Sequence, residues 1–132
     1  MHNELNILYV FLGGGIGSVL RYLVSLVWKH CQDCCSCCAS TVFPWPTLMV
    51  NVLGCFLIGL FYQCSSVWGL SPSARLLLTT GLCGGFTTFS TFSYEGITLL
   101  RSGLYGTFAL YFLLSLLLGL VAVAIPVCIG QK

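Results

Sequence analysis

Residues 104–125 form an apolar run without a charged side chain. At about 1.5 Å of rise per residue, a helix of this length crosses the ~30 Å hydrocarbon core of a bilayer. The whole chain is similar, because 58% of its residues are hydrophobic and only 6% are charged, whereas soluble domains carry roughly 25%. The sequence therefore predicts an all-α membrane protein. Its net charge of +2 is too small to indicate nucleic-acid binding.

Four membrane spans are expected, in a single domain that covers residues 1–132. The expected spans are 5–28, 44–64, 71–101 and 104–125. Pro44 and Pro46 mark the start of the second, and Ser71-Pro72 reads as an N-cap with proline at the first helical position of the third. Pro126 is expected to end the fourth. An even number of spans places both termini on the same side of the membrane.

The third span contains residues 81–92, which read Gly-Leu-Cys-Gly-Gly-Phe-Thr-Thr-Phe-Ser-Thr-Phe. The two adjacent glycines free the backbone, so a break in the helix is expected near 84–88. Irregular backbone at membrane depth is tolerated only where it is buried in protein or lines a wet cavity. Half-helix ends also direct partial charges at the break. This stretch is therefore expected to be the centre of a protein that handles an ion.

Polar groups in the first two spans have both packing and functional interpretations. Gly13 and Gly17, four residues apart, form a flat helix face suited to close packing. Arg21 follows on the same span and fits snorkelling, structural pairing, or a charge that draws anions into a vestibule. The buried amide of Asn51 needs partners; it fits an interhelical hydrogen bond or an N–H donor aimed at an anion.

The last two spans carry a hydroxyl stripe and a series of phenylalanines. Thr107, Tyr111, Ser115 and Gly119 step by four and share one helical face, which suits either packing or a polar track for a small ion. Phe86, Phe89 and Phe92 recur every three residues. They fit core packing, or ring edges whose positive rim attracts an anion. Glu95 follows, and an ionisable group there is functional or paired; Arg21 and Arg101 are the possible partners.

Three of these motifs resemble, in order and spacing, the CrcB/Fluc family of fluoride channels. They are residues 14–22 (Gly-Gly-Ile-Gly-Ser-Val-Leu-Arg-Tyr), 47–54 (Thr-Leu-Met-Val-Asn-Val-Leu-Gly) and 81–92. The resemblance covers nearly the whole chain. It implies a dual-topology homodimer of antiparallel subunits with two pores, in which fluoride passes down its gradient through a multi-pass protein of the bacterial inner cell membrane.

The resemblance also implies site residues. It implies a structural sodium ion at the dimer centre, held by the backbone carbonyls of Gly84 and Thr87 from each subunit. Fluoride contacts are implied at Asn51, Phe89, Phe92, Tyr111 and Ser115. Gly119 stands where the family often has a further hydroxyl, so this chain departs from the pattern there. Independently, fluoride is strongly hydrated, and a pore must replace its water with donors; Thr88 is a further hydroxyl donor. Conduction also needs sites weak enough to release the ion.

Two other function classes fit parts of the sequence. A small dual-topology proton-coupled cation exporter needs a carboxylate within its first span, but Glu4 lies only at the edge. A structural membrane protein could bind metal in the Cys-rich segment 31–38, where Cys31 and Cys34 have metal-like spacing without a second well-placed pair. A variable loop explains the same segment. No enzyme is expected, because His2 and His30 lie at span edges and no nucleophile–base pair is apparent.

Overall fold

The computed structural model describes residues 2–34 and 42–130, and the regular elements of these residues are all helical. The elements are α1 (His2–Cys34), α2 (Trp45–Trp68), α3 (Pro72–Leu76), η1 (Leu77–Cys83), α4 (Gly84–Phe86), α5 (Phe89–Arg101) and α6 (Tyr105–Ile129). Within the described part of the chain, α1, α2 and α6 are the helices long and apolar enough to cross a membrane. The all-α prediction is confirmed.

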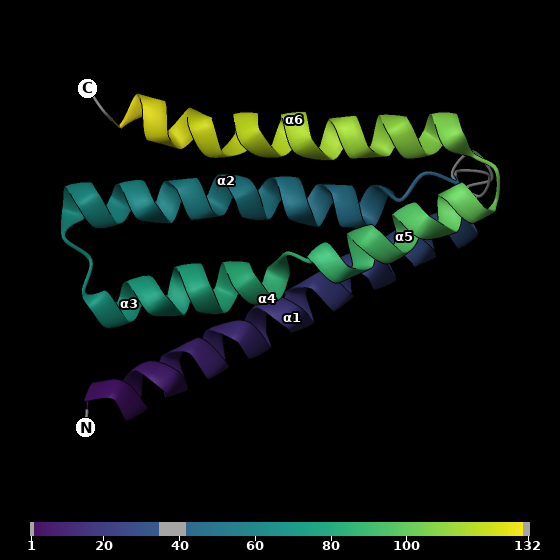
Figure 1. Cartoon of the computed structure of the whole chain (residues 1–132). Coiled ribbons are helices and arrows are strands. Elements are labelled where there is room, and N and C mark those ends of the chain that lie inside the picture. The colour runs from purple at the N-terminus through teal and green to yellow at the C-terminus, as the bar shows by residue number, and fades with distance from the viewer. Residues whose placement is uncertain (1, 35–41, 131–132) are drawn as a thin grey trace.

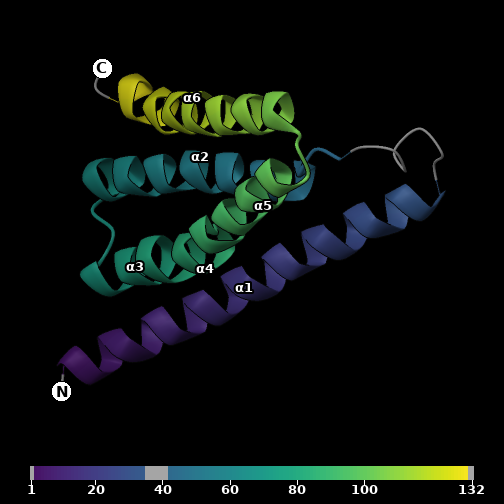
Figure 2. The ribbon, with the colours of Figure 1, turned by 45° about the vertical axis from the view of Figure 1, so that its right-hand side comes forward.

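The helices lie in the spatial order α6, α2, the α3–α4 part of the third segment (α3 to α5) and α1, and α5 leads from the end of α4 across to α6 (Figures 1 and 2). α2 packs along α6, and α1 packs on η1 and α4. Both termini and the α2–α3 connection lie at one end, and the α5–α6 connection lies at the other (Figure 1). Gly69 and Gly103 take positive φ angles of 63° and 74° at these two connections, a conformation that glycine adopts without strain.

The third segment loses its helical backbone at Thr87 and Thr88, between α4 and α5. Thr87 has φ −78° and ψ 158°, and Thr88 has φ −149° and ψ 114°. The interruption therefore lies at the C-terminal end of the range 84–88 in which a break was expected, and Gly84 and Gly85 themselves are helical, in α4. Gly85 allows α4 to approach α1 closely, because a Cβ at this position would meet the backbone of Gly14 on α1. Thr88 caps α5 by accepting a 3.2 Å hydrogen bond from the N–H of Thr91.

Glycines let α1 approach the third segment backbone to backbone. A Cβ on Gly13 would meet the carbonyl oxygen of Leu77, and a Cβ on Gly17 would meet the carbonyl oxygen of Leu82. Both glycines are buried. The facing stretch η1 is π-helical. The packing interpretation of the glycine motif is confirmed, since small residues on one face allow this approach in a membrane.

Several expected boundaries are wrong by one or two turns. α1 continues beyond Trp28 to Cys34, so Cys31 and Cys34 are helical. α6 passes through Pro126 and ends at Ile129. Pro126 is buried, and a Cβ on Gly59 of α2 would lie 3.0 Å from its ring. The ring therefore packs on the neighbouring helix, and membrane helices tolerate proline where neighbours and local adjustments satisfy the backbone.

Candidate functional site

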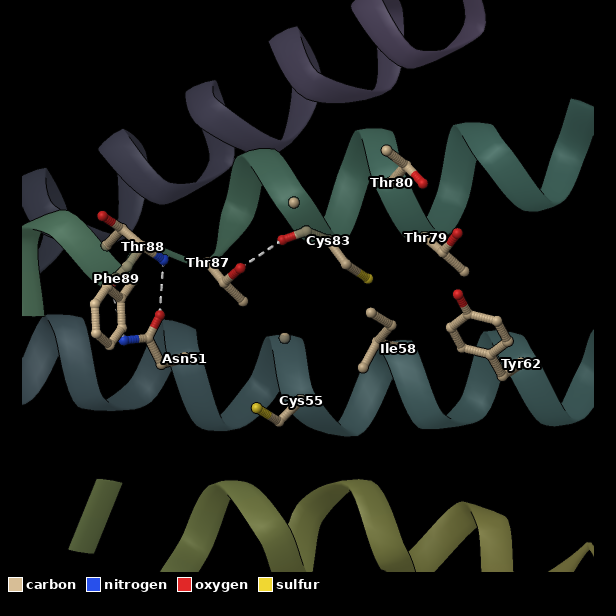
Figure 3. A pocket seen from close by; sticks show the side chains of 12 residues that line it. Asn51, Cys55, Ile58, Tyr62, Thr79, Thr80, Cys83, Thr87, Thr88 and Phe89 are labelled. Atoms are coloured by element: carbon tan, nitrogen blue, oxygen red, sulfur yellow. Dashed lines mark hydrogen bonds between the residues drawn. The ribbon is translucent and has the colours of Figure 1, made fainter. Parts of the chain in front are cut away.

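Asn51 of α2 holds the extended backbone of Thr88 through a pair of hydrogen bonds. Its Nδ2 donates to the Thr88 carbonyl at 3.2 Å, and its Oδ1 accepts from the Thr88 N–H at 2.8 Å (Figure 3). The amide therefore replaces two helical partners that Thr88 lacks at the interruption. An amide nitrogen carries two N–H groups. The second one is unused in the hydrogen bonds of the described residues.

A cleft of about 450 Å³ opens beside this pair, between α2 and the third segment (Figure 3). Its lining includes Asn51, Cys55, Thr87, Thr88 and Phe89. Phe89 is 79% exposed, and its ring lies next to Asn51 (Figure 3). Three predicted site residues (Asn51, Thr88 and Phe89) therefore meet at one cleft. Cys55, which also lines the cleft, lies one turn along α2 from Asn51.

Phe92 and Tyr111 lie apart from the cleft in the buried core of the chain. Phe92 is 5% exposed and Tyr111 is fully buried, with ring centroids 5.0 Å apart. The Phe89 ring centroid is 5.9 Å from that of Phe92. A line of aromatic rings thus runs from the cleft to α6.

The Glu95 carboxylate lies at the inner end of this line and accepts hydrogen bonds from two hydroxyls. Oε1 accepts from Thr47 Oγ1 and Oε2 accepts from Tyr111 Oη, both at 2.8 Å. In the described part of the chain its partners are thus hydroxyls, whereas the sequence suggested Arg21 or Arg101. Sequence reasoning missed Thr47 as a site residue. The available signal was its position four residues before Asn51, on the same face of α2.

The hydroxyl stripe of α6 continues from Tyr111 toward Gly119. Ser115 Oγ is buried and is the one buried side-chain polar atom without a hydrogen-bond partner in the part of the chain that the structure describes. Such a group normally has a partner. Gly119 is buried, and a Cβ there would lie 3.5 Å from Cys55 Sγ. The Cys55 thiol of α2 therefore lies next to the place where a side chain at position 119 would begin.

The carbonyls of Gly84 and Thr87 are released from ordinary helical hydrogen bonding. The N–H that would bond the Gly84 carbonyl in a continuous helix is that of Thr88, which instead bonds Asn51. The Thr87 carbonyl accepts from Arg21 Nη1 at 3.3 Å. Gly84 is exposed, and a Cβ there would meet nothing within 4 Å. Carbonyl oxygens at a helix C-terminus carry partial negative charge, so these two residues fit a cation.

The Cys-rich segment is only partly described. Cys31 and Cys34 are exposed on α1 without a disulfide, and Cys35, Cys37 and Cys38 lie outside the described residues. Over residues 2–34 and 42–130, no group of three or more His, Cys, Asp or Glu side chains is placed to hold a metal ion.

Known proteins match almost the full chain. The family model described as CrcB-like protein, Camphor Resistance (CrcB), matches residues 8–127. A protein of Phocaeicola vulgatus named fluoride-specific ion channel FluC is 46% identical over 96% of this chain and 98% of its own length. Proteins of the same name from Bacteroides fragilis and Flavobacterium psychrophilum are 45% and 48% identical, covering 96% and 88% of this chain and 96% and 89% of their own lengths. The resemblance read from the motifs is confirmed: the chain belongs to the CrcB family and is a multi-pass protein of the cell membrane.

Proposed function

We propose that this protein is a passive fluoride-selective channel that exports fluoride across the cell membrane, and not an enzyme. The observation that carries the proposal is the Asn51–Thr88 pair, which holds an extended backbone beside a cleft with an amide N–H and a phenylalanine edge available. The amide N–H and the ring edge each present a partial positive charge, and neither carries a full charge. Such groups replace water around an anion while binding it weakly enough for release. The relatives named as fluoride-specific channels support the same conclusion.

The proposed pathway runs from the cleft along the aromatic line to the hydroxyl stripe. Asn51, Thr88 and Phe89 meet the ion in the cleft, Phe92 follows, and Tyr111 and Ser115 continue on α6. The unpartnered Ser115 hydroxyl supports this route, because a buried donor without a partner is costly unless a ligand satisfies it. Glu95 has a structural role in this scheme: it orients Tyr111.

The proposed channel is an antiparallel dual-topology homodimer with two pores and a central structural sodium ion. The Gly84 and Thr87 carbonyls of both subunits would hold the ion, which would fix two interrupted third segments against each other at mid-membrane depth. Their release from helical bonding supports this assignment. Half-helix C-terminal ends and unwound carbonyls coordinate sodium in other membrane proteins.

Fluoride efflux from liposomes that contain the purified protein tests the proposal, with a fluoride electrode as the readout. Phe89→Ile and Phe92→Ile should each lower the efflux rate about fivefold, since a ring-edge contact is worth on the order of 1 kcal/mol. Isoleucine keeps bulk and loses the polarised edge. Phe11→Ile, an equally apolar change at an exposed α1 ring, is the control and should leave efflux unchanged. Absence of efflux from the unmodified protein would refute the channel, and normal efflux in both variants would refute this route.

Charge counting predicts how the subunits insert. In the expected topology of four spans, Arg75 and Lys132 count toward the side that carries the termini, and Lys29 and Arg101 count toward the opposite side. Orientation follows the Lys/Arg bias of short loops, and this balance leaves no preference. Lysines added after Gln131 should orient all copies one way and abolish efflux. Co-expression with a Ser102→Lys/Tyr105→Lys variant, biased the other way, should restore it. A reporter fused to Lys132 that is found on one side only in the unmodified protein would contradict dual topology.

A further inference from the structure

Helices α2 and α6 run side by side in the same direction (Figure 1). Residues at the same level of the two helices have a constant separation in the sequence, as three pairs show: Thr47 with Tyr111, Cys55 with Gly119, and Gly59 with Val123. The first pair shares the Glu95 carboxylate, and in the other two a Cβ on the glycine would meet the partner residue. The same separation places Ser115 level with Asn51. The polar residues of the two helices therefore lie in successive levels, one helical turn apart.

At the level of Gly119 the polar group comes from α2 alone. The hydroxyl stripe of α6 steps by four residues and reaches Gly119, which has no side chain. A Cβ at this position would lie 3.5 Å from Cys55 Sγ, and the Cys55 side chain lies on the α6 side of α2 (Figure 3). Cys55 also lines the Asn51 cleft and is only partly buried. The thiol therefore borders both parts of the proposed pathway, the cleft and the end of the stripe.

The Cys55 thiol has an unused hydrogen-bond donor. None of the hydrogen bonds of the described residues involves Cys55 Sγ. One turn earlier on α6, the buried Ser115 hydroxyl is also without a partner in this part of the chain. An S–H group is a weak donor and carries no full charge. Weak contacts suit a conduction pathway, because the ion must be able to leave each site that it enters. The thiol is therefore available to a passing anion.

We propose that Cys55 is a contact residue of the ion pathway, whose S–H donates to the anion at the end of the α6 stripe. The inference rests on the proposed channel function, in which the anion is fluoride. The thiol takes the place of a hydroxyl at position 119, so this level keeps a donor although α6 supplies none. Because the thiolate of a cysteine is nucleophilic, the same contact makes the channel sensitive to thiol reagents.

Moving the donor from one helix to the other tests the proposal in the liposome efflux assay. Cys55→Ala should lower the efflux rate about fivefold, through loss of one weak hydrogen bond to a charged partner. Cys55→Ser keeps a donor and should stay within about twofold. Gly119→Ser, added to Cys55→Ala, should restore the rate, because its hydroxyl enters the space that the thiol leaves. Gly119→Ala in the same background fills the space without a donor; it is the matched control, and its rate should remain low.

Thiol modification removes the donor without a substitution. Methyl methanethiosulfonate is small and neutral; the Cys55 thiolate attacks its divalent sulfur, releases methanesulfinate and leaves a mixed disulfide that has no S–H. Efflux should fall about fivefold and recover when dithiothreitol reduces the disulfide. Cys55→Ser should resist the reagent. Cys64→Ser should stay sensitive, because it changes a thiol of the same helix that does not line the cleft.

A readout without transport separates this inference from the channel function. Sodium fluoride at its half-saturating concentration, compared with sodium gluconate, should slow labelling of Cys55 by the reagent about twofold, since half of the sites are then occupied. Mass spectrometry follows the labelling, and Cys64 should be unaffected. If the unmodified protein passes no fluoride and fluoride still protects Cys55, the channel proposal fails and the contact stands.

Three results would overturn the contact and leave the channel in place. They are a conducting protein in which fluoride does not protect Cys55, an unmodified rate in Cys55→Ala, and a rescue by Gly119→Ala equal to that by Gly119→Ser. If Cys55→Ala does not fold, fluoride protection of the unmodified protein decides.

Discussion

Asn51→Asp is expected to lower fluoride efflux at least about 100-fold, equivalent to roughly 3 kcal/mol at 1.4 kcal/mol per factor of ten. The carboxylate can still accept from the Thr88 N–H, but it has no N–H for the Thr88 carbonyl, which then faces a negatively charged oxygen. The same change removes the donor available to the anion and places a like charge in the cleft. The effects all oppose permeation, so this variant should be nearly inactive in the liposome assay.

Gln63→Glu is the matched control for this variant. Gln63 is also an amide of α2, and its Nε2 donates to the carbonyl of Gly130. The substitution places a carboxylate oxygen against the Gly130 carbonyl, as Asn51→Asp places one against the Thr88 carbonyl. Gln63 lies near the end of α2, far from the interruption. Efflux should remain within about threefold of the unmodified protein, because no proposed ion contact changes. Equal losses in the two variants would show that Asn51 acts only through stability.

Gly17→Ala is expected to prevent the chain from folding into a stable helical bundle. The added Cβ would collide with the Leu82 carbonyl oxygen and the Phe86 nitrogen. These are backbone atoms, so no side-chain rotation relieves the overlap and the helices must separate. We expect a loss of about 3 kcal/mol or more, at the upper end for overpacked sites. The melting temperature and the yield of monodisperse protein in detergent measure it.

Gly15→Ala and Gly106→Ala provide controls of identical chemistry. A Cβ at either position meets nothing within 4 Å in the subunit, and alanine is the better helix former by up to about 1 kcal/mol. Both variants should therefore be at least as stable as the unmodified subunit. If Gly17→Ala were equally harmless, α1 would not pack on the third segment as closely as the structure shows.

Much of the fold follows from local patterns in the sequence. Apolar length predicted helices at three of the four spans, and Ser71-Pro72 predicted an N-cap that accepts from the Ala74 N–H at 3.2 Å. The four-residue spacing of Gly13 and Gly17 predicted that both lie on one closely packed helix face. These features depend on neighbours along one helix, which a sequence displays directly.

Features that depend on contacts between helices were not predictable in the same way. The glycine pair at 84–85 was the reason to expect a break near 84–88, but the interruption falls on Thr87 and Thr88, and Gly85 instead allows close approach of Gly14 on α1. α6 continues through Pro126, whose ring packs beside Gly59 of α2. Glu95 pairs with two hydroxyls from α2 and α6, although charge matching favoured arginine. The sequence named Asn51 as a candidate site residue but did not identify the Thr88 backbone as its hydrogen-bond partner.

The close contact between α1 and the third segment also determines the order in which the subunit is completed during synthesis. α1 leaves the ribosome first, but its glycine face packs on η1 and α4, which are made only after α2. The chain must therefore hold an unpacked first helix in the membrane while roughly fifty further residues are added, at about 5–20 residues per second. A nascent chain that ends after Trp68 has its glycine face open to lipid, and chains of this length are the ones on which membrane quality control should act.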